Sequence, residues 1–106
     1  MLVVTTENIT GYKVTEVKGE VFGLIVRSRG LGGNIMAGLR SLAGGEIHEY
    51  TKMLEDARQQ AIDRLISNAE SKGANAVVMM RFDSSEIGQN MSEVLAFGTA
   101  VVIEKE

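Results

Sequence analysis

One long amphipathic pattern constrains the fold more than any other feature of this sequence. Between residues 47 and 69, apolar residues recur every three or four positions, at Ile47, Tyr50, Leu54, Ala57, Ala61 and Leu65, with Ile62, Ile66 and Ala69 widening the stripe. This spacing predicts a helix with one buried face. Glu46 and Glu49 fall in its first turn, where the helix dipole favours acidic side chains. Lys72 and Gly73 follow at the other end, as a basic last turn and a C-terminal stop. Such a helix is about 40 Å long, so we expect it to cross the whole domain.

Two later segments predict strands that are apolar on both faces. In residues 76–83 both alternating sets are apolar at the start, and in residues 94–103 they are apolar along most of the length. One helix covers only one face of such a sheet, and exposing the other face would leave a large apolar patch on a soluble monomer. We therefore expect a homo-oligomer, formed by packing sheet on sheet or by continuing the sheet between subunits. The alternative is that the Gly-rich connection and a short helix fold over the second face.

The beginning of the chain predicts two further strands. Met1–Thr6 is β-branched and apolar, which is typical of a short strand. A longer β-rich stretch runs from Tyr12 to Val26 and contains Gly19. We interpret it as one strand that is bent or bulged near this glycine, because glycine within a strand pattern usually marks a bulge. Two separate strands joined by a turn are the alternative.

The remaining segments predict connections and one short helix. Residues 27–34 form a Gly-rich connection, and Asn34 is an N-cap candidate for a short helix through Leu42. Residues 83–86, with two serines and two acids, are expected to be a loop. No repeat, low-complexity tract or linker divides the chain. The sequence therefore predicts a single α+β domain over residues 1–106.

Composition argues against several classes of function. Eleven Lys and Arg residues against 14 Asp and Glu give a net charge of −3, whereas nucleic-acid binders normally carry a basic excess. The absence of cysteine excludes disulfides, iron–sulfur clusters, thiolate zinc sites and cysteine nucleophiles. The apolar runs are far shorter than the roughly 20 residues of a membrane span, and no signal-peptide pattern is present. We expect a cytoplasmic protein without nucleic-acid or membrane partners.

Arginines around the Gly-rich connection suggest an anion pocket. Arg27 and Arg29 lie beside Gly30-Leu31-Gly32-Gly33, whose backbone amides would be free to approach an anion, and Arg40 follows. The pattern is neither of the two known phosphate motifs, because Ile35 stands where the dinucleotide fingerprint needs glycine and the Walker Gly-Lys pair is missing. We predict that Arg27 and Arg29 bind a ligand. A plain flexible crossover is the alternative.

The only histidine suggests a metal site. His48 is flanked by Glu46 and Glu49, and imidazole and carboxylate groups ligate divalent metals. A zincin motif is excluded, because its second histidine would have to replace Lys52. We predict Glu46, His48 and Glu49 as metal ligands, with a surface or capping role for the histidine as the alternative. No nucleophile, base and acid occur in a recognisable catalytic pattern, so we expect no enzyme.

Several separated strings of the sequence resemble one family. They follow the family's order and extend over nearly the whole chain: Arg40-Ser41-Leu42-Ala43-Gly44-Gly45-Glu46-Ile47, Tyr50-Thr51, Ala57-Arg58 with Ala61, Gly73-Ala74-Asn75-Ala76-Val77-Val78, Arg81-Phe82-Asp83 and Phe97-Gly98-Thr99-Ala100-Val101. In these strings the chain resembles the YbjQ-like family, also called heavy-metal-binding domains. One departure is Phe97, which stands where relatives commonly have Tyr and so lacks a hydroxyl.

The resemblance implies both a fold and a function. The implied fold is a dodecin-like α+β subunit, with a small antiparallel sheet packed on one long helix, that assembles into a ring of five. The implied ligand is a heavy metal, although the thiolates that soft metals prefer are absent. We expect a homo-oligomeric, pentameric binding module with a divalent metal ion or a small ligand at its subunit interfaces. The alternative is a scaffold ring that presents a surface to protein partners and holds no ligand.

Overall fold

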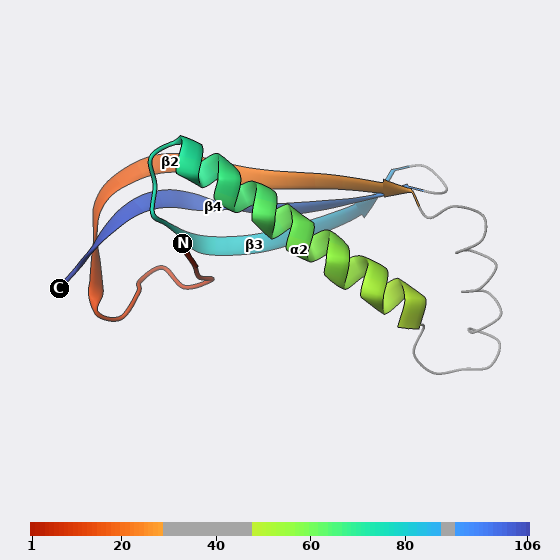
Figure 1. The fold of residues 1–106 in the computed structure, drawn as a ribbon, viewed down its shortest axis with the longest axis horizontal. Coiled ribbons are helices and arrows are strands. Elements are labelled where there is room, and N and C mark those ends of the chain that lie inside the picture. Colours follow the sequence, from red (N-terminus) through yellow and green to blue (C-terminus); the bar gives the residue numbers. More distant parts are fainter. Residues whose placement is uncertain (29–47, 88–90) are drawn as a thin grey trace.

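The fold is a four-stranded sheet with one long helix across it. The structure is a computed structural model and describes residues 1–28, 48–87 and 91–106. It contains the helix α2 (His48–Ser71) and the strands β1 (Leu2–Val3), β2 (Tyr12–Ser28), β3 (Ala76–Glu86) and β4 (Met91–Lys105). The strand order is β1-β3-β4-β2. α2 runs diagonally across one face of the sheet (Figure 1), chiefly over β2 and β4. The predicted α+β class is confirmed, and the short helix predicted within residues 34–42 lies outside the described ranges.

The sheet is mixed, so the prediction of an antiparallel sheet is wrong for its first strand. β4 pairs antiparallel with both β2 and β3, but β1 pairs parallel with β3, where Leu2 lies opposite Ala76. The reason is the course of the chain. β1 joins at the free edge of β3, far from β3 in sequence, and no hairpin forces the two strands to run in opposite directions.

The long helix has the predicted stripe and the predicted end. Ala57, Ala61, Leu65 and Ala69 are buried against the sheet, whereas Leu54, predicted on the same face, is 44% exposed. Beyond the last turn, the amide of Gly73 donates to Glu70 O at 2.9 Å and the amide of Ala74 donates to Ala69 O at 3.1 Å. Gly73 has a φ of 83°, the left-handed conformation that this type of helix end requires. The helix itself ends at Ser71, so Lys72 follows the last turn instead of lying within it.

One strand confirms its predicted form and another extends beyond it. β2 is a single strand, as predicted, and its register with β4 shifts near Gly19, between Val17 and Gly19, and also between Val14 and Glu16. Residues 83–86, predicted as a loop, belong to β3 and pair with β4 as far as Glu86 opposite Ser92. Ser and Asp have a low propensity for strands. Here the hydrogen bonds to β4 outweigh this low propensity and hold the four residues in a strand.

Apolar residues gather on both faces of the sheet. On the inner face, which α2 covers, the main cluster includes Val21, Ile25, Leu65, Val77 and Val94. On the outer face a second cluster consists of Ala76, Val78, Val101 and Ile103, and the partly buried Val4 and Ile9 pack against it. The molecule measures 54 × 24 × 16 Å, with a radius of gyration of 17.1 Å, against about 13 Å for a compact domain of this length. It is thus a thin, elongated two-layer molecule.

Candidate functional site

The outer face carries an apolar groove toward the other end of the sheet. The groove has a volume of about 500 Å³ and is lined by Glu20, Phe22, Leu24, Asp83, Glu93, Leu95 and Phe97. We call these seven residues the outer groove. Its floor consists of two directly opposed cross-strand pairs, Phe22 with Phe97 and Leu24 with Leu95. Phe22 and Phe97 are 55% and 39% exposed. In the described part of the chain, no segment covers these side chains as Val4 and Ile9 cover the second cluster.

Strand alternation and one glycine decide which side chains point outward. Val21 and Ile25 are buried under α2, so the intervening Phe22 and Leu24 project from the opposite face. Gly23 lies directly under the helix, where an added Cβ would collide with Ala61 O and Leu65 N. This close contact holds α2 against β2 and determines which alternate residues of β2 face the helix. The outward direction of the groove residues therefore follows from the packing on the other side.

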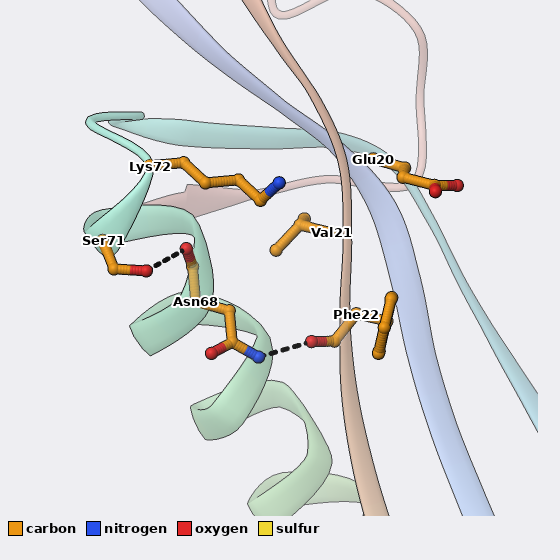
Figure 2. Close-up of a pocket in the computed structure, with 6 residues that line it drawn as sticks. All are labelled: Glu20, Val21, Phe22, Asn68, Ser71 and Lys72. Atoms are coloured by element: carbon orange, nitrogen blue, oxygen red, sulfur yellow. Dashed lines mark hydrogen bonds between the residues drawn. The ribbon is translucent and has the colours of Figure 1, made fainter.

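Side chains of α2 cap the free edge of β2 beside the groove. β2 is an edge strand. Asn68 Nδ2 donates to Phe22 O at 2.7 Å (Figure 2), and Arg64 Nη1 donates to Leu24 O at 2.7 Å. Figure 2 also shows Val21 pointing toward α2, while Glu20 and Phe22 lie on the other side of β2. Any strand that joined this edge would have to displace both hydrogen bonds, so the two side chains oppose edge-to-edge pairing along this part of β2.

A small hollow lies at the same edge, between β2 and the end of α2. It has a volume of about 270 Å³ and is lined by Glu20, Val21, Phe22, Asn68, Ser71 and Lys72. Its polar side chains are partly engaged, because Asn68 binds Phe22 O and Ser71 Oγ donates to Asn68 O at 2.8 Å (Figure 2). These hydrogen bonds tie the end of the helix to the strand, which gives the hollow a structural role.

Three carboxylates surround the apolar floor of the outer groove. Glu20, Asp83 and Glu93 come from β2, β3 and β4 respectively. Glu93 Oε2 accepts a hydrogen bond from Ser85 Oγ at 3.0 Å. The salt bridge found within the described residues, between Lys18 and Glu16, lies outside the groove. The groove thus combines an apolar floor with an acidic rim.

The residues predicted as ligands lie at the junction of β2 and α2, or outside the described residues. Glu46 and Arg29 fall outside the described ranges, and the side chain of Glu49 is also outside the description. His48 is the first residue of α2 and is exposed. Arg27, near the end of β2, is half-buried. It lines a hollow of about 250 Å³ with Lys52, Met53 and Asp56 of α2, so the structure brings this arginine close to the start of the helix.

The outer groove is the feature that sequence reasoning missed. The signal was present, because Leu95 and Phe97 share one face of a strand whose other face is also apolar. The acidic residues were harder to predict. The sequence predicts a loop at Asp83, and Glu93 reaches the groove only through the pairing of β4 with β2, where it lies opposite Val26. Among the described residues no three His, Cys, Asp or Glu side chains are grouped as a metal site would require.

Comparison with known proteins places the chain in a family. The family YbjQ_1, described as "Putative heavy-metal-binding", matches residues 1–104. The chain belongs to this family. It is 67% identical to a UPF0145 protein from Bradyrhizobium over 98% of this chain and 94% of the relative. A UPF0145 protein from Methanocella arvoryzae is 60% identical over 100% of this chain and 88% of its own length. The resemblance seen in the separated strings is therefore confirmed.

A solved structure supports the fold. A crystal structure of a protein of unknown function from Pediococcus pentosaceus, of the DUF74 family, superposes with a TM-score of 0.69 and covers 98% of each chain. Its sequence identity is 14%, so the likeness concerns the fold alone. In the described part of this chain, no helix is long and apolar enough to cross a membrane.

Proposed function

We propose that the protein is a non-enzymatic, homo-oligomeric binding module whose copies meet over the outer groove and hold a small ligand there. The observation that carries this proposal is the groove itself, with its exposed Phe22, Leu24 and Phe97. Large apolar side chains that gather on one face of a soluble protein mark an interaction surface. A cytoplasmic location is a prediction from the sequence and belongs to the same proposal.

A second copy of this chain is the partner that fits the groove. Specific ligand sites bury most of the ligand surface, whereas this groove lies on a thin two-layer subunit and is open on one side. A second copy placed over it supplies the missing wall. The hydrogen bonds to Phe22 O and Leu24 O oppose continuation of the sheet at the edge of β2.

The number of copies follows from the family resemblance and not from the groove. The resemblance implies a ring of five subunits, and a groove that receives a different surface of the next copy gives a closed ring when the rotation between neighbouring copies is one fifth of a turn. We therefore propose a pentamer, whose mass distinguishes it from a dimer of the same chain.

The experiment is a native mass measurement of the wild type and two matched variants. Phe22→Glu introduces a charge into the groove, and the expected result is loss of the oligomer. Leu54→Glu introduces the same charge on α2, at a side chain that is also exposed (44%), and is expected to leave the oligomer intact. A monomeric wild type, or an oligomer that survives Phe22→Glu, would overturn the assembly proposed here.

A metal site at the start of α2 is the second part of the proposal, because the family description names heavy-metal binding. We propose Glu46, His48 and Glu49 as its ligands, with Arg27 and Arg29 available for an anionic group. Metals bound to the folded state raise its apparent stability. Zn²⁺ and Ni²⁺ should therefore raise the melting temperature of the wild type but not of His48→Ala. An oligomer that neither a metal nor a ligand of the outer groove stabilises would support the scaffold alternative.

A further inference from the structure

We infer that the ligand of the outer groove is an organic cation with an apolar body, such as a quaternary ammonium or phosphonium ion. This inference deepens the proposed function and rests on it, because the groove becomes an enclosed site only when a second copy covers it. It concerns the outer groove and is independent of the metal site at the start of α2.

The floor of the groove selects for an apolar body. Phe22 and Phe97 are directly opposed on neighbouring strands, and Leu24 and Leu95 form the next pair along the groove. The volume of about 500 Å³ lies within the range of small-molecule sites. Aromatic rings also attract cations through their quadrupole, most strongly when the site excludes water.

The rim of the groove selects for positive charge. Glu20, Asp83 and Glu93 approach the floor from three different strands, and the described residues offer them no salt bridge. A basic residue, Arg81, lies beside the floor by register, opposite Phe97 on β3. Its guanidinium donates to Thr5 O at 2.7 Å and to Met80 O at 2.9 Å, so it is engaged with the N-terminal segment. These carbonyl acceptors leave the charge of Arg81 in place, but the three carboxylates outnumber it, so the rim as a whole favours a cation over an anion.

Closure of the groove strengthens the same preference. When a second copy covers the floor, it removes water from the carboxylates, and an unpaired charge without water is costly. A cation between the two copies offsets this cost. A bare metal ion would gain nothing from the phenylalanines and leucines, and a neutral apolar molecule would leave the acids unpaired. A cation with an apolar body satisfies both parts of the groove.

The experiment compares two probes of nearly equal size and opposite charge. Calorimetric titration of the wild-type oligomer with tetraphenylphosphonium is expected to give binding at least about tenfold tighter than titration with tetraphenylborate. Glu20→Gln, Asp83→Asn and Glu93→Gln are each expected to weaken phosphonium binding about threefold, and the triple variant is expected to remove the preference for the cation. Glu55→Gln, on the exposed surface of α2 and outside the groove, is the matched control and should bind as the wild type does.

The outcomes separate this inference from the proposed function. If the native mass shows an oligomer but tetraphenylborate binds as tightly as tetraphenylphosphonium, or neither binds, the inference is overturned and the assembly stands. If the Gln and Asn variants keep the oligomer and the full preference for the cation, the acidic rim is not responsible and the inference again fails. A monomeric wild type would instead overturn the assembly on which the inference rests.

Discussion

The two halves of the outer face carry the same kind of side chain and differ in what lies over them. In the covered half, Val101 and Ile103 are buried beneath Val4 and Ile9. In the open half, Phe22 and Phe97 form a similar apolar surface but are 55% and 39% exposed. Both halves are built on β4 and its neighbours. An apolar outer face therefore does not reveal whether its cover comes from the same chain or from another molecule.

The length of the N-terminal segment explains where the cover ends. After β1 the chain stays close to β3, because the amides of Met79 and Met80 donate to Thr6 O and Val4 O at 3.1 and 3.0 Å. The chain then turns back at residues 9–12 and enters β2, where Tyr12 pairs with Lys105 at the end of β4. This short path covers only the β3 and β4 side of the covered half, since Val14 and Val17 of β2, opposite Ile103 and Val101, are 44% and 65% exposed. We infer that the covered half serves folding and that the open half is left for association.

The largest expected effect tests this division of roles. Ile103→Ala in the covered half should lower the free energy of unfolding by about 2–4 kcal/mol, since it opens a cavity in a buried cluster. The loss should be the same at every protein concentration. Leu24→Ala in the open half should lower the melting temperature by an amount that depends on protein concentration, because it weakens association. Thermal unfolding over a hundredfold range of protein concentration distinguishes the two.

The comparison fails if the two variants behave alike. A concentration-dependent loss for Ile103→Ala would mean that the covered half also takes part in assembly. A loss for Leu24→Ala that is independent of concentration would mean that the open half contributes only to the fold of the single chain.

A smaller effect is expected from loosening the cover. The Arg81 guanidinium holds the N-terminal segment through Thr5 O. Arg81→Met keeps the length and the apolar stem of the side chain but removes the donor, so it should cost about 1–2 kcal/mol. Hydrogen exchange should quicken at the amides of Met79 and Met80, which bond to this segment. Lys13→Met, an exposed basic residue of β2, is the control. Unchanged exchange in Arg81→Met would show that the backbone hydrogen bonds hold the cover without the arginine.

Local patterns in the sequence were sufficient for the helix and for the long strands. The stripe around Ala61 and Leu65 and the stop at Gly73 depend on near neighbours in the chain, and the structure confirms them. The continuation of β3 through Ser84 and Ser85 could not be predicted in this way. Those residues are held in a strand by pairing with β4, a contact between segments that no local propensity describes.

The site was less predictable than the fold for the same reason. His48 and Arg27 are conspicuous in the sequence because charged residues stand beside them, and the structure describes only part of that region. The outer groove depends on register, which sets Phe22 opposite Phe97 although they are 75 positions apart. As expected, α2 covers only one face of the sheet. The alternative cover, the Gly-rich connection with a short helix, lies mostly outside the described residues. That residues 4–9 cover one half of the other face was not predicted.

The smallest expected effect on stability comes from removing the side chains that cap the free edge of β2. In the proposed assembly these caps favour contact through the outer face of the sheet. Asn68→Ala should lower the free energy of unfolding by only about 0.5–1 kcal/mol, because the freed Phe22 O is close to solvent and water replaces the lost donor. Its consequence for association should be more visible. In the double variant Asn68→Ala with Arg64→Met, Phe22 O and Leu24 O lose their donors, so the edge of β2 can pair with another strand. Light scattering should then detect larger assemblies, whereas Gln60→Ala on the same helix should not produce them. If the double variant keeps the wild-type mass, the two capping side chains do not prevent association through the edge of β2. The bulges at Glu16 and Gly19 are then the features that protect this edge.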